Sequence, residues 1–348
     1  MGACGDAADA CGSDKDVVSA PPAGPKRSRV TYISWAESCS RSDHTARELG
    51  GRSHMVYEGR LGSQASTVLW KYWLQGRTTA RILREEQPDV VFVMTPPLVA
   101  AIPAFWYAWR RGAHVVLDAH SAAFMHPRWR WFQWLQRWMC RRAATTLVHN
   151  DHIAAVVEGA GGRATLVPDV PIVYERSEAF ARPPQFTVAV VCSFNYDEPL
   201  PAIIEAARSV PDVRFFVTGN PKHLDPALKA QMPANMTLTG FLTTEAYGSL
   251  ISGADAVLTL TTRNHTMLRG AYEAIYQGTP VIVSDWPLLR ESFPDGAVHV
   301  DNSPAAIAAA VDTVRREPAL FKAGAARLAA AKLARWSATK QTLSAIGR

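Results

Sequence analysis

The sequence predicts an α/β protein built from two doubly wound, Rossmann-like domains that face a central cleft. Short apolar runs alternate with helix-like segments, a pattern typical of parallel sheets covered by helices on both faces. The chain has 348 residues, which suits two domains of about 150 residues better than one core. The alternation stops at a proline-rich stretch, 168–184, and then restarts.

The first half contains a set of short apolar runs that we interpret as strands. One of them begins a stretch from Val90 to Trp109 that has no charged residue and about the length of a membrane span. Pro96, Pro97 and Pro103 interrupt it, so we expect a buried strand, a turn and a helix there. The predicted strands of this half are 29–34, 90–94, 114–118 and 145–149.

The second half repeats the alternation and closes on an alanine-rich stretch, 304–332, which predicts one or two helices. The last residues are expected to pack back across the linker onto the first domain. The predicted strands here are 187–192, 213–218, 236–239, 256–260 and 280–284.

These boundaries divide the chain. The first residues are rich in Ala, Gly, Asp and Pro and lack the apolar core of a signal peptide, so we interpret them as a disordered tail. We expect a tail at 1–28, a first domain at 29–170, a linker at 171–184, a second domain at 185–335 and a closing segment at 336–348.

Composition limits the classes of function. Hydrophobic residues make up 48% and charged residues 20% of the chain, which excludes wholesale disorder. The net charge of +6 suits nucleic acid, an anionic membrane or a phosphorylated substrate. Basic residues are spread along the chain without a nucleic-acid motif, so nucleic acid is not expected as a partner. The five cysteines are scattered and form no CxxC pair, which favours a reducing, cytoplasmic compartment.

The segment from Asn264 to Asp285 carries the strongest functional signal. A polar loop follows the strand 256–260, and a helix is expected to begin near Met267. A helix start offers unpaired N–H groups and a positive dipole end, which suit a pyrophosphate. We therefore expect a phosphate site at the helix start, formed by Arg263, Thr266, Met267, Leu268 and Arg269.

Glu273 stands four residues after Arg269, so the two share a helix face. Its carboxylate could accept both hydroxyls of a ribose, although a plain surface ion pair would have the same spacing. The helix is expected to end at Gly278 with a left-handed cap. Gly219 and Asn220, at the end of another strand, could line the same pocket because glycine lets a ligand approach the backbone.

Glu273-Ala274 and the run Gly278-Thr279-Pro280-Val281-Ile282 resemble the donor half of GT-B glycosyltransferases of family 4 (group 1). The resemblance covers roughly residues 29–335 and implies a GT-B fold, with an acceptor-binding first domain and a nucleotide-sugar-binding second domain. It implies that Glu273 binds the ribose of the nucleotide.

The chain departs from the family pattern at two places. His265 stands where the family has a second glutamate, eight positions before Glu273, as in a subgroup of bacterial polysaccharide-type transferases. We include His265 among the candidate catalytic residues and leave retaining or inverting chemistry open. The family's basic residues after the first strand of the second domain are also missing, and Arg269 is the candidate to replace their charge.

Polar residues at two strand ends of the first domain are the candidate acceptor side. His120 resembles the active-site histidine that GT-B enzymes carry at this strand end, and an imidazole could remove a proton from an acceptor hydroxyl. Asp118 could be the base instead, with His120 orienting. Arg41 and Ser42 could contact phosphate of the donor or of a lipid acceptor, or Ser42 could simply cap a helix.

The stretch 127–142 interleaves tryptophan with arginine. Projected as one helix, its apolar residues fall on an arc of about 160° flanked by arginine, as in helices that lie in a lipid headgroup layer. A core-packing helix with solvated arginines is the alternative. The arc contains Trp131, Phe132, Trp134, Leu135, Trp138 and Met139, and its flanking residues include Arg137 and Arg141.

The resemblance and these sites predict a glycosyltransferase, of the hexosyltransferase class, for polysaccharide biosynthesis. It would move a sugar from a nucleotide-diphosphate donor to a lipid-linked or glycan acceptor at the cytoplasmic face of the membrane, as a peripheral protein. No metal or other cofactor is expected, because the acidic residues of the predicted cleft lack a DxD pair and a helix dipole and arginine could neutralise the phosphates. The alternatives are a nucleotide-sugar epimerase of the same fold and a non-enzymatic nucleic-acid-binding protein.

Overall fold

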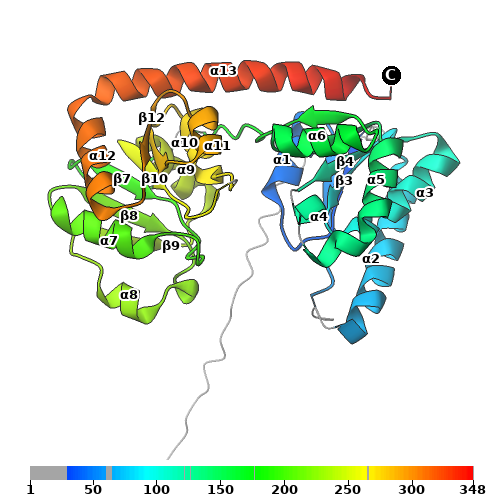
Figure 1. Ribbon diagram of the computed structural model, residues 1–348, viewed down its shortest axis with the longest axis horizontal. Helices are drawn as coiled ribbons and strands as arrows, with labels where there is room; N and C mark the ends of the chain where they lie inside the picture. Colours follow the sequence, from blue (N-terminus) through cyan, green and yellow to red (C-terminus); the bar gives the residue numbers. More distant parts are fainter. Residues whose placement is uncertain are drawn as a thin grey trace, which may run out of the picture.

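The computed structural model describes residues 30–59, 65–120, 122–125, 127–175, 177–264 and 266–347. The predicted tail 1–28 and the candidate His265 lie outside these residues. Figure 1 shows two α/β units side by side, joined by an extended segment and by the last helix. Each unit is a six-stranded sheet in which every strand pair is parallel. The predicted α/β architecture of two doubly wound sheets is confirmed.

The N-terminal sheet has the order β2-β1-β3-β4-β5-β6. All predicted strands of this half are present, and the sheet gains two short ones, β2 and β6, at its edges. Their sequences, RSHM and ATL, are too short and too polar to stand out as apolar runs. The strands are β1 (Val30–Ser34), β2 (Arg52–Met55), β3 (Val90–Thr95), β4 (His114–Ala119), β5 (Thr145–Val148) and β6 (Ala164–Leu166). The helices are α1 (Ser40–Glu48), α2 (Ala65–Glu86), η2 (Leu98–Ala101), α3 (Ile102–Arg111), α4 (Ala122–Met125), η3 (Pro127–Phe132), α5 (Gln133–Arg142) and α6 (Asp151–Gly159).

The C-terminal sheet has the order β12-β11-β10-β7-β8-β9. Chain order reverses beside β7, and ligands of such sheets bind at the carboxyl ends of the strands flanking that point. The strands are β7 (Thr187–Val190), β8 (Arg214–Thr218), β9 (Met236–Gly240), β10 (Ala256–Thr259), β11 (Val281–Ser284) and β12 (Ala297–Val300). The helices are α7 (Leu200–Ser209), η4 (Pro221–His223), α8 (Pro226–Ala230), α9 (Thr244–Gly253), α10 (Arg269–Tyr276), α11 (Pro287–Ser292), α12 (Pro304–Arg316) and α13 (Pro318–Ala345).

The apolar stretch from Val90 to Trp109 folds as predicted, into the buried strand β3, a proline turn with η2, and α3. Among the helices in the described ranges, none is both long enough and apolar enough to cross a bilayer.

Helix α13 ties the two halves together. It runs along one side of both units in Figure 1. Trp336 and Leu343 pack into the N-terminal core beside Val30 and Tyr32, and the Lys340 ammonium lies 2.9 Å from a carboxylate oxygen of Glu48. The expected return of the closing segment onto the first domain is therefore confirmed.

The tryptophan-rich stretch 127–142 corrects one prediction. It is not a single helix, because a 3-10 turn, η3, ends at Phe132 and α5 begins only at Gln133. The change of pitch breaks the projected arc, and within α5 the face that packs on the core is Gln136, Met139 and Cys140, so Met139 is buried. Trp131, Trp134 and Trp138 remain exposed, as do Arg137 and Arg141.

Candidate active site

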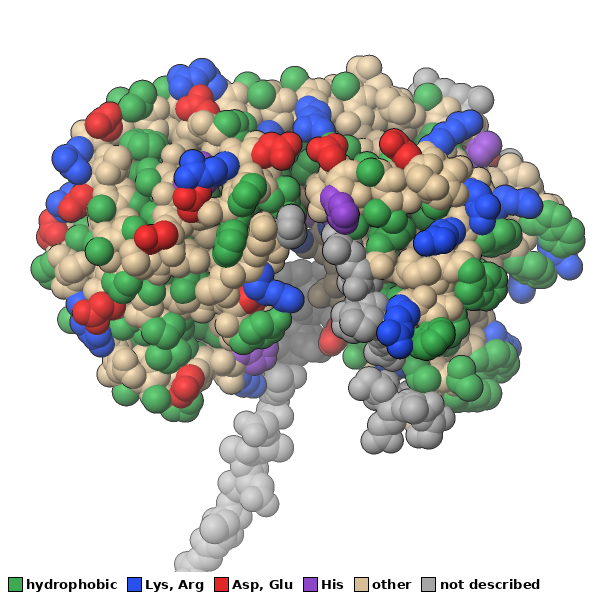
Figure 2. Space-filling view, in the orientation of Figure 1, with side chains coloured by type: hydrophobic (Ala, Val, Ile, Leu, Met, Phe, Trp, Pro, Cys, Tyr) green, Lys and Arg blue, Asp and Glu red, His purple; other side chains and the backbone are tan. Residues whose placement is uncertain are grey.

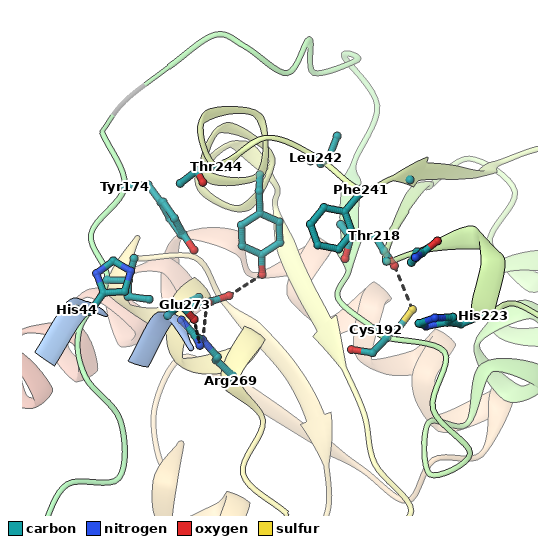
Figure 3. Close-up of a pocket in the computed structure, with 17 residues that line it drawn as sticks. His44, Tyr174, Cys192, Thr218, His223, Phe241, Leu242, Thr244, Arg269 and Glu273 are labelled. Carbon is teal, nitrogen blue, oxygen red and sulfur yellow. Dashed lines mark hydrogen bonds and ion pairs between the residues drawn. The ribbon is translucent and has the colours of Figure 1, made fainter. Parts of the chain in front are cut away.

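A cavity of about 490 Å³ opens between the carboxyl edge of the C-terminal sheet and α1 of the N-terminal unit. Figure 3 shows its walls converging on Glu273 and Arg269 at one end and on Phe241 and His223 at the other. The residues that line it are Ser40, His44, Ile172, Tyr174, Cys192, Ser193, Thr218, Gly219, Asn220, His223, Gly240, Phe241, Leu242, Thr244, Tyr247, Arg269 and Glu273.

Glu273 is held rigidly at the cavity wall. Its side chain is 9% exposed, with Arg269 Nε donating to Oε1 at 2.8 Å and the Tyr247 hydroxyl donating to Oε2 at 2.6 Å. Burial, the Glu273 charge and a hydrogen bond to it raise the pKa of Tyr247, so this phenol stays protonated as a donor. The carboxylate is therefore oriented by two donors while one edge still borders the cavity.

Arg269 connects the two units at the cavity. It is the first residue of α10, and its guanidinium also donates to the Ser40 hydroxyl at the start of α1. The residue before it, Leu268, carries no side chain that could cap the helix N–H groups. A Cβ on Gly270 would come within 2.7 Å of a Val191 methyl, so this glycine lets α10 start tight against the exit of β7.

The loops after β8 and β9 form the opposite wall. Gly219 has φ +119°, and a Cβ there would lie 2.6 Å from the Cys192 carbonyl oxygen, so only glycine fits. Asn220 caps η4 by accepting from the Lys222 amide at 3.0 Å. Phe241 is largely exposed beside the opening.

The structure therefore places Glu273, Arg269, Gly219 and Asn220 together on one cavity. The other candidates of the phosphate site lie apart from it. Leu268 is buried in the core and Met267 packs against the same cluster, whereas Thr266 is half-buried and does not border the cavity. The Arg263 guanidinium donates to the Tyr196 hydroxyl at 2.6 Å and lies over that ring.

A second polar cluster lies inside the carboxyl edge of the N-terminal sheet. Asp118 is fully buried and accepts from Arg41 Nε at 3.0 Å and from the Tyr32 hydroxyl. Burial opposes ionisation of Asp118, but the charge of Arg41, supported by neighbouring histidines, outweighs it and holds the pKa of this carboxyl well below its usual range.

Arg41 and Ser42 are buried inside the N-terminal unit and form hydrogen bonds there. Arg41 also donates to the Val167 carbonyl at 3.0 Å, and Ser42 shares a hydrogen bond of 2.6 Å with Ser34 while both are buried. Neither side chain reaches the cavity, and the helix cap is Cys39 rather than Ser42.

His120 stands at the end of β4, partly exposed, with its amide donating to the Thr95 carbonyl at 2.9 Å. Its ring lies 5.0 Å from that of His149, between centroids. Burial lowers the pKa of His120, against the pull of Asp118, so the imidazole is neutral near pH 7. Burial, with Arg41 adding to it, lowers the pKa of His149 to about 3.

Several site residues were missed by sequence reasoning. Tyr174 and Tyr247 flank Glu273 from the linker and α9, and His149 ends β5 beside His120. None lies in a motif; only the topology brings them there. Ser40 and His44, on α1, were missed because that segment was interpreted through Arg41 and Ser42. Across the described ranges, no three His, Cys, Asp or Glu side chains gather closely enough to hold a metal ion.

Comparisons with known proteins follow the same division into halves. A family model described as a glycosyl transferase 4-like domain matches residues 7–172. Another, described as glycosyl transferase-like, matches residues 201–343. No curated protein matches the sequence.

Solved structures share the fold at low identity. Sucrose-phosphate synthase from Thermosynechococcus elongatus has a TM-score of 0.66 at 12% identity, over 90% of this chain and 97% of that one. HepE from Anabaena, in complex with UDP and glucose, has a TM-score of 0.65 at 12% identity, over 91% and 98%. A putative UDP-N-acetylglucosamine 2-epimerase from Listeria monocytogenes has a TM-score of 0.57 at 13% identity, over 86% and 91%.

Proposed function

The chain is a GT-B glycosyltransferase of the family 4 (group 1) type, and from this premise we propose what it transfers and where. The donor is a nucleoside diphosphate sugar bound in the cavity at Glu273 and Arg269. The acceptor is a lipid-linked molecule or a growing glycan, used at the cytoplasmic face of a membrane. The donor assignment rests on Glu273, whose carboxylate is oriented by two hydrogen-bond donors and lines the cavity, where it could accept both hydroxyls of a ribose.

The rest of the cavity is consistent with that donor. The uncapped start of α10 and the Arg269 guanidinium supply positive charge for two phosphates. The HepE structure contains UDP and glucose, which supports a uridine diphosphate sugar as the first compound to test. Both family models describe glycosyl transferases, which favours sugar transfer over the epimerase and nucleic-acid-binding alternatives.

For the base, the geometry favours His120 over Asp118. Asp118 is buried and accepts at one oxygen from Arg41 and Tyr32, and the charge of Arg41 outweighs burial, so this carboxylate has little affinity for a proton. His120 is neutral near pH 7 and partly exposed at the strand end, so it can accept the acceptor hydroxyl proton. Asp118 then acts through its charge: burial lowers the pKa of His120, and the negative charge of Asp118 partly offsets that lowering.

The membrane part of the proposal rests on exposed side chains. Trp131, Trp134 and Trp138 reach solvent, and the Arg130 and Arg142 guanidiniums lie over two of these rings. Indole and guanidinium together suit the headgroup layer of an anionic bilayer. Such a surface would hold the enzyme where a lipid-linked acceptor is found.

Glu273→Ala tests the donor site. Two hydrogen bonds from ribose hydroxyls to a carboxylate are lost, so UDP should bind about 100-fold more weakly. Isothermal titration with UDP measures this directly. Glu205→Ala is the matched control, because Glu205 also pairs with an arginine of its own helix but lies exposed on α7. Equal UDP affinity in the wild type and Glu273→Ala would refute the assignment.

A further inference from the structure

An apolar groove of about 480 Å³ lies between α2 and α3, away from the donor cavity. A second cavity of about 500 Å³ adjoins it across Ile102 and Trp106 and extends to Trp138 on α5. Ile102 and Trp106 of α3 form a shared wall between the groove and this second cavity, which reaches Trp138 of α5. The walls of the groove include Trp35, Trp73, Gly76, Arg77, Pro103 and Trp106.

The inner end of the groove lies at the catalytic edge of the N-terminal sheet. Trp35 directly follows β1, and Val99 belongs to η2, which begins two prolines after the end of β3. The next strand in the sheet, β4, carries His120, whose amide bonds the last residue of β3, Thr95. A molecule lying in the groove thus has one end beside the strand end that bears the proposed base.

Gly76 keeps the groove open at a cost to the helix. It lies inside the 22-residue helix α2, where glycine is less favourable than alanine because its backbone loses more conformational freedom. Its backbone does not require glycine, and among the described atoms a Cβ there would meet only Pro103 Cγ, at 3.8 Å. Neither packing nor conformation accounts for the missing side chain, whereas a ligand passing over this turn does.

The helices that form the groove expose indoles beside arginines, which suits an anionic membrane surface. Trp73 and Trp106 line the groove, and Trp70 and Trp109 are exposed elsewhere on α2 and α3. The Arg77 and Arg110 guanidiniums lie 4.8 and 4.3 Å from the ring centroids of Trp73 and Trp106. Figure 2 shows hydrophobic and basic side chains intermixed over this end of the molecule.

Acidic residues are sparse on the two helices that form the groove, because α2 has them only at its last two residues, Glu85 and Glu86, and α3 has none. Between residues 90 and 150 the only acidic side chain is Asp118, which is buried. Arginine next to indole, with no opposing acid in that stretch, matches phosphate headgroups above an apolar layer.

We propose that the groove between α2 and α3 holds the hydrocarbon chain of a membrane lipid whose phosphate-linked head carries the acceptor hydroxyl. This inference rests on the proposed transferase function and names its acceptor class. The lipid would pass from the bilayer along the groove, with its head at the ends of β1 and β3 next to His120, while the nucleotide sugar occupies the donor cavity across the cleft.

Photolabelling tests the groove. Full-length protein is bound to phosphatidylglycerol vesicles that contain a polyprenyl phosphate with a diazirine on its chain, and the crosslinked peptides are identified by mass spectrometry. The label should appear on α2 and α3. In Gly76→Leu the new side chain fills the groove, and labelling there should fall about tenfold or more, the equivalent of 1.4 kcal/mol in binding. Gly76→Ala should give an intermediate loss.

Gly159→Leu is the matched control, because Gly159 is also helical but a Cβ there meets no described atom within 4 Å. It should label like the wild type, and all variants should keep their UDP affinity and helical circular dichroism. Undiminished labelling in Gly76→Leu, or label confined to α5 or to the C-terminal unit, would overturn the proposal. Labelling does not require sugar transfer. If the groove is labelled but no sugar is transferred to lipid, the proposed function fails while the lipid-binding groove stands.

Discussion

Two arginine–carboxylate pairs stand at the facing edges of the two sheets, and they do different work. Arg41 and Asp118 are 3.0 Å apart, with side chains 10% and 1% exposed. Arg269 and Glu273 are 2.8 Å apart, with side chains 42% and 9% exposed. The first pair is buried in protein, whereas the second borders a cavity. Chemical identity alone therefore does not mark a binding residue; unfilled space beside it does.

The partners of each pair explain the difference. Tyr32 and the Val167 carbonyl bond the first pair from within the N-terminal unit. The second pair is braced by Tyr247 and by Ser40, which belong to different units. The contacts of the first pair thus lie within one half of the molecule, whereas those of the second pair join the two halves beside the cavity.

Arg41→Met gives the largest expected effect on this comparison. It leaves Asp118 as an uncompensated buried charge, which destabilises by about 3–5 kcal/mol. Urea unfolding followed by circular dichroism measures the loss, and UDP affinity at temperatures where the variant is folded should stay at the wild-type value. The double variant Arg41→Met with Asp118→Leu removes both charges and should recover much of the stability. A stable Arg41→Met protein that has lost UDP binding would mean that Arg41 is a donor ligand after all.

His120→Gln comes next in size. Glutamine keeps a polar group of similar reach but cannot take a proton, so kcat should fall about 100-fold or more while the affinity for UDP is unchanged. Because the pKa of His120 is lowered from its ordinary value, the wild-type rate should fall on the acid side only below about pH 6.5. Steady-state rates between pH 5 and 8 check this, and that acid limb should be absent in the variant. Equal losses of UDP affinity in His120→Gln and Glu273→Ala would contradict the proposal that His120 serves the reaction and Glu273 serves donor binding.

The sequence predicted one of the two pairs and not the other, for a physical reason. Arg269 and Glu273 are four residues apart on one helix, so their contact follows from helical geometry. Arg41 and Asp118 are 77 residues apart, and their contact depends on how helix α1, which carries Arg41, packs against the sheet that contains β4. The strands themselves were predictable because buried parallel strands form uninterrupted apolar runs. The edge strands β2 and β6, the pitch change at Phe132 and the groove at Gly76 depend on tertiary packing that no local pattern records.

Arg269→Met should have the smallest of these effects and is the sharpest test of what the half-exposed pair does. Its guanidinium is partly solvated, so the free energy of unfolding should change by less than about 1 kcal/mol. If it contacts phosphate, UDP should bind about tenfold more weakly, while uridine, which carries no phosphate, should bind as it does to the wild type. Arg208→Met, in the exposed pair on α7, serves as the control. Equal losses for UDP and uridine would show that Arg269 acts only by orienting Glu273, and the phosphate charge would then have to come from the N–H groups at the start of α10.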